Sequence, residues 1–320
     1  ATWRGIRRSV QKIWFAENAE MQDTRLETHS FIAGTPLHIM ISLSLIRQLD
    51  IKSVSKLKIV DYFNGAENVY KRMSELNWEY DGLEVSFFPS HRQAYIDSLK
   101  DKTDHLYLDS DASFQRYLDL MAITAVRPDI NIIVFEDGVG TYRTDLYAGL
   151  KKVIFDAVGV GTYLGGHRKT STVFVFDEQR YRNVFPQVKA EVVQIAERLE
   201  DTISRLSVEL DYIFGHQIEH SSHHHICNLY LSNWKIDEAA IEMLAELNGD
   251  TFVKLHPHIK RSNLHSNIVQ IDNRVPAEIV ILNLSKNYQE VHVYHHGSSV
   301  EQYITSQNVD FINVQRLLVA

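Results

Sequence analysis

The sequence predicts an α/β protein in which two Rossmann-like domains face each other across a cleft. Short apolar segments alternate with amphipathic ones along the whole chain, as in a series of strands and helices. The length of 320 residues exceeds what one hydrophobic core usually supports. A polar, histidine-rich stretch also interrupts the apolar pattern. We therefore expect an N-terminal domain over 1–210, a linker over 211–225 and a C-terminal domain over 226–320.

The first half has the pattern of a doubly wound parallel sheet. Its expected strands are short and apolar on both faces, and its helices carry apolar residues at spacings of three and four. We expect strands at 29–34, 56–63, 82–88, 105–110, 131–135 and 171–177, and helices at 36–49, 67–76, 91–99, 111–123 and, as one long helix, 186–206.

The second half reads as a smaller copy of the same architecture, with no short-period repeat. We expect strands at 226–232, 251–255, 267–271 and 291–297, and helices at 236–247, 276–284 and 298–304. In open α/β sheets, ligands bind at the carboxyl ends of the strands. The residues that follow each strand are therefore the first candidates for a functional site.

Composition restricts the class of protein and its compartment. The content of 44% hydrophobic residues is that of an ordinary globular protein. The single cysteine, Cys227, excludes an internal disulfide and favours a reducing compartment, so we expect a cytoplasmic protein. The longest apolar run, 36–46, is too short to span a bilayer.

The net charge argues against nucleic-acid binding, whereas the charges near the N-terminus are compatible with contact with a membrane surface. The net charge of −8 argues against a general nucleic-acid binder, which needs a basic surface. Residues 1–14, however, mix apolar and aromatic side chains with four cations. This pattern is typical of a basic amphipathic helix on an anionic membrane, and equally of a helix that packs on its own domain.

Two adjacent carboxylates follow the most apolar strand of the first half. In NIIVFEDGVGTY (131–142), Glu136 and Asp137 end the strand, and Gly138 allows the chain to turn. Neighbouring carboxylates repel each other, which tends to raise the pKa of one of them and favours a base that works near neutral pH.

Polar residues also follow a strand of the second half, in FVKLHPH. Lys254 and His256 lie at the strand end, and Pro257 holds His256 in an extended backbone conformation. An imidazole held in this way suits an acid or a phosphate ligand.

Three further turns offer contacts for a nucleotide. Gly297, Ser298 and Ser299 begin a helix, where hydroxyls and backbone N–H groups favour a phosphate, although Ser298 taken alone is more often only an N-cap. Glu278 suits a ribose or ordinary first-turn helix chemistry. Another strand-to-helix turn provides Ser232 and Asn233.

Taken in order, these motifs resemble the bacterial polysialyltransferase (capsular sialyltransferase) family. The family's hallmarks are an acidic pair followed by glycine, and His-Pro. They match EDG at 136–138 and HP at 256–257, followed by SS at 298–299. The turn GTPLHI (34–39) is similar to the family's opening turn, and the resemblance extends from about residue 28 onward.

The resemblance implies a type-B glycosyltransferase fold and an inverting transfer from CMP-sialic acid without a metal or other cofactor. Glu136 would be the general base, with Asp137 as its pKa partner or as the alternative base. His256 would meet the departing phosphate, and Gly138 and Pro257 would support the two motifs. The C-terminal domain would bind CMP through Ser298, Ser299, Gly297, Glu278, Ser232, Asn233 and Lys254.

The same resemblance implies that the N-terminal domain binds an acceptor, a sialic-acid polymer or a glycolipid, during capsule polysaccharide biosynthesis. An anionic acceptor needs cations, although each candidate is also a plausible solvated surface charge. The candidate acceptor contacts are His38, Arg92, Arg143, Lys151, Lys152, Arg168 and Lys169. Contacts with the inner membrane or with capsule assembly proteins would follow from this role.

Other patterns suggest different functions. Asp109 and Asp111 form a D-x-D, which holds a metal in type-A glycosyltransferases, although Asp111 is also placed to cap a helix. The histidines at 220 and 223–225 with Cys227 lack the paired spacing of a structural zinc site. The glycines at 138–140 and 159–166 form only a loose dinucleotide fingerprint. A lipooligosaccharide sialyltransferase that adds one residue, and a non-catalytic anionic-glycan binder, remain alternatives.

Overall fold

The computed structural model describes residues 26–49, 53–80, 82–215, 225–233, 236–256, 259 and 268–314. The amphipathic segment at 1–14, most of the expected linker with its histidines at 220, 223 and 224, and Pro257 lie outside the described residues.

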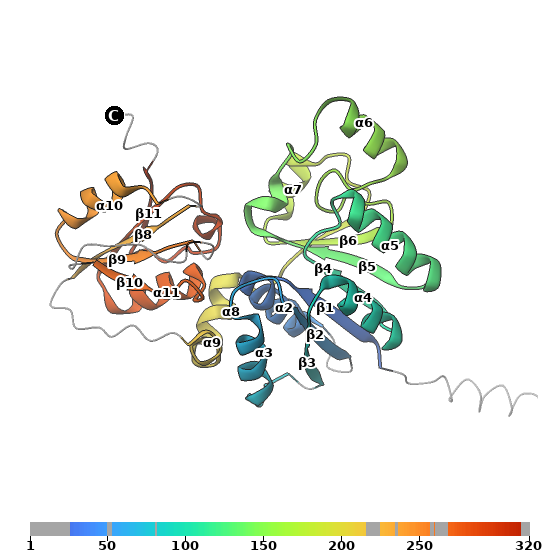
Figure 1. Ribbon diagram of the computed structural model, residues 1–320, viewed down its shortest axis with the longest axis horizontal. Coiled ribbons are helices and arrows are strands. Elements are labelled where there is room, and N and C mark those ends of the chain that lie inside the picture. Colours follow the sequence, from blue (N-terminus) through green and yellow to red (C-terminus); the bar gives the residue numbers. More distant parts are fainter. Residues whose placement is uncertain are drawn as a thin grey trace, which may run out of the picture.

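Two parallel sheets organise the chain (Figure 1). The larger has the strand order β3-β2-β1-β4-β5-β6-β7 and the smaller β10-β9-β8-β11-β12. The strands of the larger sheet are β1 (Thr28–Ala33), β2 (Val54–Val60), β3 (Leu83–Phe88), β4 (His105–Leu108), β5 (Asn131–Phe135), β6 (Thr170–Val175) and β7 (Glu191–Gln194). Those of the smaller are β8 (Ile226–Leu231), β9 (Asp250–Lys254), β10 (Ile268–Ile271), β11 (Glu290–His295) and β12 (Val309–Asn313).

Helices connect the parallel strands. They are α2 (Pro36–Gln48), α3 (Ala66–Glu75), α4 (His91–Lys100), α5 (Phe114–Val126), η1 (Gly138–Tyr142), α6 (Gly149–Val158), α7 (Glu178–Val184), α8 (Leu199–Arg205), α9 (Ser207–Phe214), α10 (Glu238–Ala245), α11 (Ala277–Asn287) and η2 (Ser299–Gln302). In each sheet the strand order reverses direction once, between β1 and β4 and between β8 and β11. The predicted pair of doubly wound sheets is confirmed, and the second is a smaller copy of the first.

The long helix predicted over 186–206 is wrong. Residues 191–194 instead form β7, which pairs with β6 in parallel, and the helix begins only at Leu199. Two adjacent β-branched residues, Val192 and Val193, fit a sheet edge better than a helix, and Val192 is buried there. The helix predicted at 298–304 is reduced to the short 3-10 turn η2.

A continuous hydrophobic core joins the two sheets. It contains residues of the first sheet such as Phe31 and Ile59, residues of the second such as Val293, and Ile203 and Ile213 from α8 and α9. The short helices α8 and α9 lie between the two lobes (Figure 1). A second cluster, around Ile132 and Tyr181, covers the other face of the larger sheet.

Polar contacts supplement this packing. Glu200 of α8 accepts hydrogen bonds from the Thr305 backbone N–H (2.8 Å) and hydroxyl (2.7 Å), and from Ser306. Arg72 of α3 donates to the carbonyls of Tyr212 and Ile213 at the end of α9. Both domains are thereby fastened to the α8–α9 pair, with the carboxyl ends of several strands turned toward one crevice.

Candidate active site

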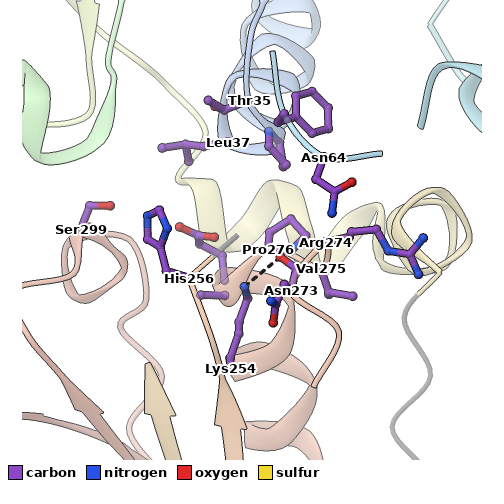
Figure 2. Close-up of a pocket in the computed structure, with 14 residues that line it drawn as sticks. Thr35, Leu37, Asn64, Lys254, His256, Asn273, Arg274, Val275, Pro276 and Ser299 are labelled. Carbon is purple, nitrogen blue, oxygen red and sulfur yellow. Dashed lines mark hydrogen bonds between the residues drawn. The ribbon is translucent and has the colours of Figure 1, made fainter. Parts of the chain in front are cut away.

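The crevice between the domains contains a cavity of about 330 Å³ (Figure 2). Its walls come from the segments that follow β1, β2, β9 and β10, together with the first turns of α2 and α11 and one residue of η2. The lining residues are Thr35, Pro36, Leu37, Phe63, Asn64, Lys254, His256, Asn273, Arg274, Val275, Pro276, Ala277, Glu278 and Ser299.

A buried cation and a buried acid share one side of the cavity. Lys254, at the end of β9, donates to the Asn273 carbonyl at 3.3 Å. Burial lowers the pKa of Lys254 to about 8, against the opposing effect of Glu278 and Asp272. Burial likewise raises the pKa of Glu278, and Lys254 partly offsets that shift. A buried lysine whose described hydrogen-bond partner is a backbone carbonyl suits an anionic ligand.

The first turn of α11 faces the same space. Pro276 at its N-cap makes no side-chain cap hydrogen bond, and Pro276, Ala277 and Glu278 all line the cavity. The first N–H groups of a helix lack intrahelical partners and carry partial positive charge. Together with Lys254, this helix start makes the floor of the cavity suitable for a phosphate.

His256 projects toward the cavity in Figure 2. Its backbone N–H donates to the Ser232 hydroxyl at 2.7 Å, and its carbonyl accepts from the Ile259 N–H at 2.8 Å. Ser232, a predicted CMP contact, therefore holds the backbone of His256. Asn233, the next predicted contact, is exposed and does not line the cavity.

Residues 297–299, here called the serine loop, were predicted together as phosphate contacts, but the structure gives them different contacts. The Ser298 side chain accepts from the Val300 N–H and caps η2. The backbone N–H groups of Gly297 and Ser298 donate to His295 Nδ1 at 3.1 and 3.0 Å. Ser299 alone lines the cavity. Ser298 therefore acts as an N-cap in this structure, which is the more frequent role of a serine at such a position.

The acidic motif and the serine loop meet across the domain boundary at Gly138. The φ angle of Gly138 is 56°, a left-handed conformation, and a Cβ there would lie 3.0 Å from Ser299 Oγ. A side chain at this position would be strained and would push the serine loop away. Only glycine allows the two motifs to approach so closely.

Glu136 lies between the lobes but does not line the cavity. It is only 1% exposed. One carboxylate oxygen accepts from the Tyr303 hydroxyl of the second domain at 2.9 Å, and the other accepts from the Phe176 N–H at 2.8 Å and from the Tyr142 hydroxyl at 3.3 Å. Burial raises the pKa of Glu136, while these hydrogen bonds limit the rise.

Asp137 is the accessible member of the pair, with a side chain 44% exposed. Its carboxylate contacts His38 Nε2 at 2.8 Å, and His38 Nδ1 lies 3.7 Å from Asp109. Burial alone would lower the pKa of His38, but the hydrogen bond to Asp137 and the two acidic charges raise it. His38 is buried and therefore orients Asp137; it is not available to contact an acceptor as predicted.

The two acids of the D-x-D motif belong to separate networks. Asp111 is fully buried and accepts from the Gly165 N–H (2.8 Å), the His167 N–H (3.0 Å) and the Thr170 hydroxyl (2.6 Å). It therefore fixes the 161–170 loop and does not cap α5, whose N-cap is Ser113. Asp109 turns toward His38.

Within the described part of the chain, one group brings three possible metal ligands within 4.8 Å of one another: Glu27, His29 and His105. His29 and His105 lie near the amino ends of β1 and β4, at the opposite edge of the sheet from the cavity.

The six cations predicted as acceptor contacts do not gather around the cavity. None of them lines it. Arg143 pairs with Asp145, Lys151 stacks on Tyr147 and Phe155, and Arg168 stacks on Tyr117. Arg92, Lys152 and Lys169 have partly or fully exposed side chains.

Sequence reasoning missed several residues of the site. Tyr303 carries no signal in the sequence, because a tyrosine in a short helical segment is ordinary core material. Asn273 and Arg274 follow β10 and could have been found by applying the strand-end rule to that short strand. Thr35 was noted only as part of the opening turn.

Comparison with known proteins identifies the chain. A family model described as alpha-2,8-polysialyltransferase matches residues 66–292, well over half of the sequence. This chain belongs to the alpha-2,8-polysialyltransferase family. It is therefore a glycosyltransferase of the sialyltransferase class. No curated protein matches it by sequence.

One solved sialyltransferase structure is similar to this chain in fold. The chain is similar to an alpha/beta-galactoside alpha-2,3-sialyltransferase from Photobacterium phosphoreum, with 13% identity, a TM-score of 0.54, and 89% of this chain and 90% of that chain covered. A UDP-GlcNAc 2-epimerase from Neisseria meningitidis also matches, at 13% identity and a TM-score of 0.46 over 85% and 78% of the two chains. The predicted type-B arrangement of two Rossmann-like domains is thus confirmed.

Proposed function

We propose that this polysialyltransferase-family member is an inverting, metal-independent enzyme that extends α-linked sialic-acid chains from CMP-sialic acid. The contact of the Glu136–Asp137–Gly138 turn with Ser299 carries the proposal. It sets the acidic motif of one domain beside a cavity that the other domain equips with a cation, an imidazole and the first turn of a helix. This arrangement supports a mechanism in which a carboxylate and phosphate-binding groups act on opposite sides of the transferred sugar.

The donor would enter from the second domain. Lys254, the first turn of α11 and Ser299 suit the CMP phosphate, and Glu278 suits the ribose hydroxyls. His256 would stabilise or protonate the phosphate as the bond from sialic acid to that phosphate breaks. Ser298, Gly297 and Ser232 would act by shaping the serine loop and the backbone of His256, as their hydrogen bonds indicate.

The acceptor hydroxyl would lose its proton to Glu136 as it attacks the anomeric carbon. Glu136 already accepts hydrogen bonds from two hydroxyls, those of Tyr303 and Tyr142, so its carboxylate is oriented to accept a proton. The proposal requires the acceptor hydroxyl to take the place of the Tyr303 hydroxyl. Asp137, more exposed and held by His38, is the alternative base.

Transfer to an oligosialic acceptor in the presence of EDTA tests this proposal. Wild-type protein should release CMP and lengthen the acceptor, both measured by mass spectrometry. Glu136→Gln should lose at least about a thousandfold in rate while still binding CMP, because the proton then has no acceptor. Asp137→Asn, its matched control, should lose less. The reverse ranking would assign the base to Asp137, and a requirement for added metal would overturn the mechanism.

The length of the product distinguishes a polymerase from an enzyme that adds one residue. We propose repeated addition, in capsule biosynthesis in the cytoplasm, on the basis of the family match. None of the described helices has the length and apolar character needed to cross a bilayer. A ladder of products from one acceptor supports polymerisation; a single added residue would instead indicate the lipooligosaccharide type of sialyltransferase.

A further inference from the structure

Helix α6 exposes its apolar face to solvent. None of its residues is buried, and Leu150, Val153, Ile154 and Val158 are exposed by 74%, 63%, 50% and 46%. At 100° per residue these four side chains lie on one face of the helix. A surface helix normally turns such a face toward the core, so this one lacks its partner in the isolated chain.

The neighbouring helix α5 extends the apolar surface. Phe114 and Leu118 are 52% and 46% exposed. The ring of Phe114 lies 6.3 Å from that of Phe155 on α6, so the two helices are in contact. Figure 1 places α6 at the outer end of the larger lobe, remote from the smaller sheet. We call these six residues, Phe114, Leu118, Leu150, Val153, Ile154 and Val158, the α6 patch.

The charge beside the α6 patch is positive, although the chain as a whole carries −8. Residues 143–169 contain five cations and two acids, Asp145 and Asp156. Lys151 follows Leu150 directly and packs its amino group on the ring of Phe155, 5.3 Å from its centroid. Aliphatic side chains between basic and aromatic ones are the composition of a helix that lies in the headgroup region of an anionic bilayer.

We propose that the α6 patch docks on a membrane surface that contains anionic lipids. A polyanionic glycan would use the cations but gain nothing from Leu150, Val153 and Ile154, whereas a lipid surface uses both. No residue of α6 lines the cavity between the domains, so docking through this face leaves the cavity open. The inference does not depend on the chemistry proposed for that cavity.

Flotation of the full chain with vesicles tests the proposal. Wild-type protein should float with vesicles of equal parts phosphatidylcholine and phosphatidylglycerol, less so with phosphatidylcholine alone, and less as salt rises. Leu150→Ser/Val153→Ser/Ile154→Ser should reduce the bound fraction by about tenfold. Val208→Ser is the control, because Val208 on α9 is 77% exposed and lies outside the α6 patch, with the aromatic Tyr212 as the exposed side chain one turn along its helix. Melting temperatures of all variants establish that they are folded.

A positive signal from insertion strengthens the test. After subtraction of the signal from the four tryptophans of the wild-type chain, Ile154→Trp should show a blue-shifted emission with the anionic vesicles and quenching by brominated lipid, because its ring would sit at the acyl boundary. Undiminished flotation of the triple variant would overturn the proposal and move membrane binding to another segment, such as residues 1–14. The proposal would also be overturned if neither protein binds vesicles and the wild-type protein forms a dimer that the triple variant does not form.

Discussion

The pKa of Glu136 is set by the burial of its carboxylate and by the three hydrogen-bond donors that contact it. Burial raises its pKa, which keeps a carboxylate reactive as a base near neutral pH. The Tyr303 hydroxyl favours the charged form and opposes the rise. If Glu136 is the base, activity falls as pH drops through this raised pKa.

Removing the Tyr303 hydroxyl should therefore move the acidic limb of the rate profile. We expect Tyr303→Phe to raise the apparent pKa of that limb by about half a pH unit, because one donor to the carboxylate is lost. Tyr142→Phe, which removes the longer 3.3 Å contact, should shift it less. The check is kcat/KM against pH on an oligosialic acceptor, because kcat/KM reports the free enzyme, in which the Tyr303 hydroxyl is still bound to Glu136. A limb that stays in place or moves to lower pH contradicts the role of Glu136.

Lys254 provides a second test at the scale of one residue. Its lowered pKa of about 8 means that about half of the molecules carry a neutral lysine at pH 8. A phosphate bound beside Lys254 would favour the charged form of its amino group. CMP binding at pH 8 should therefore be accompanied by the uptake of about half a proton per protein molecule. Calorimetry in two buffers of different ionisation enthalpy measures this uptake.

Lys254→Met should abolish the uptake and weaken CMP binding. Lys71→Met is the matched control, because Lys71 is an exposed lysine that pairs with Glu67 on α3. Equal proton uptake by wild type and Lys254→Met would show that the phosphate binds elsewhere.

At the scale of elements, the strands and helices from β1 to β5 were the best predicted. Buried strands such as β1 and β5 have apolar runs that end at a polar turn, and their carboxyl ends identified Glu136 and Asp137. The strand-end rule also found Lys254, His256 and Ser299, because sheet topology alone brings these turns to one edge. The region from 186 to 206 failed because its apolar spacing is compatible with a helix, while β7 forms only beside β6.

Contacts between elements could not be predicted. The Tyr303–Glu136 hydrogen bond joins residues 167 positions apart and depends on how the two domains dock. The link from Asp109 through His38 to Asp137 likewise needs the ends of three parallel strands to meet. Sequence spacing fixes which face a residue occupies, but not the partner that another domain brings to it.

The 161–170 loop is held in place by Asp111, which gives a prediction for this element. Asp111→Ala leaves two buried N–H groups and one hydroxyl without an acceptor, so we expect a loss of about 3 kcal/mol in the free energy of unfolding. Urea unfolding measures it. Asp111→Asn, which keeps one acceptor oxygen, should lose less.

The same two variants test the metal-dependent alternative. If Asp111 held a metal with Asp109, activity of Asp111→Asn would fall and excess Mn²⁺ or Mg²⁺ would restore part of it. We expect no metal rescue, because the Asp111 carboxylate is already bound by three donors of the 161–170 loop.

For the whole molecule, the docking of the two domains depends on α8 and α9. Glu200 contributes a charged acceptor to the second domain. Burial opposes ionisation of Glu200, but the hydrogen bonds from Ser306 and Thr305 outweigh it and lower its pKa. Its stabilising effect is therefore present above the ordinary glutamate pKa and is lost as pH falls through the lowered value.

Glu200→Gln should accordingly lower the melting temperature at pH 7, by an amount that corresponds to about 1–2 kcal/mol. The difference from wild type should shrink as the pH falls through the lowered pKa of Glu200, where the wild-type carboxylate becomes protonated. Thermal unfolding across this pH range is the measurement. A difference that is constant with pH would mean that the charge of Glu200 does not hold the domains together.

In the proposed mechanism, one domain presents a carboxylate and the other a phosphate site to a single donor sugar. A crystal structure with CMP bound measures this directly. We predict the phosphate within hydrogen-bond distance of Lys254, Ser299 or the first N–H groups of α11, the ribose beside Glu278, and the Glu136–Asp137 turn facing the vacant sugar position. CMP bound outside the cavity, or a closed complex in which neither Glu136 nor Asp137 reaches that position, would contradict the account.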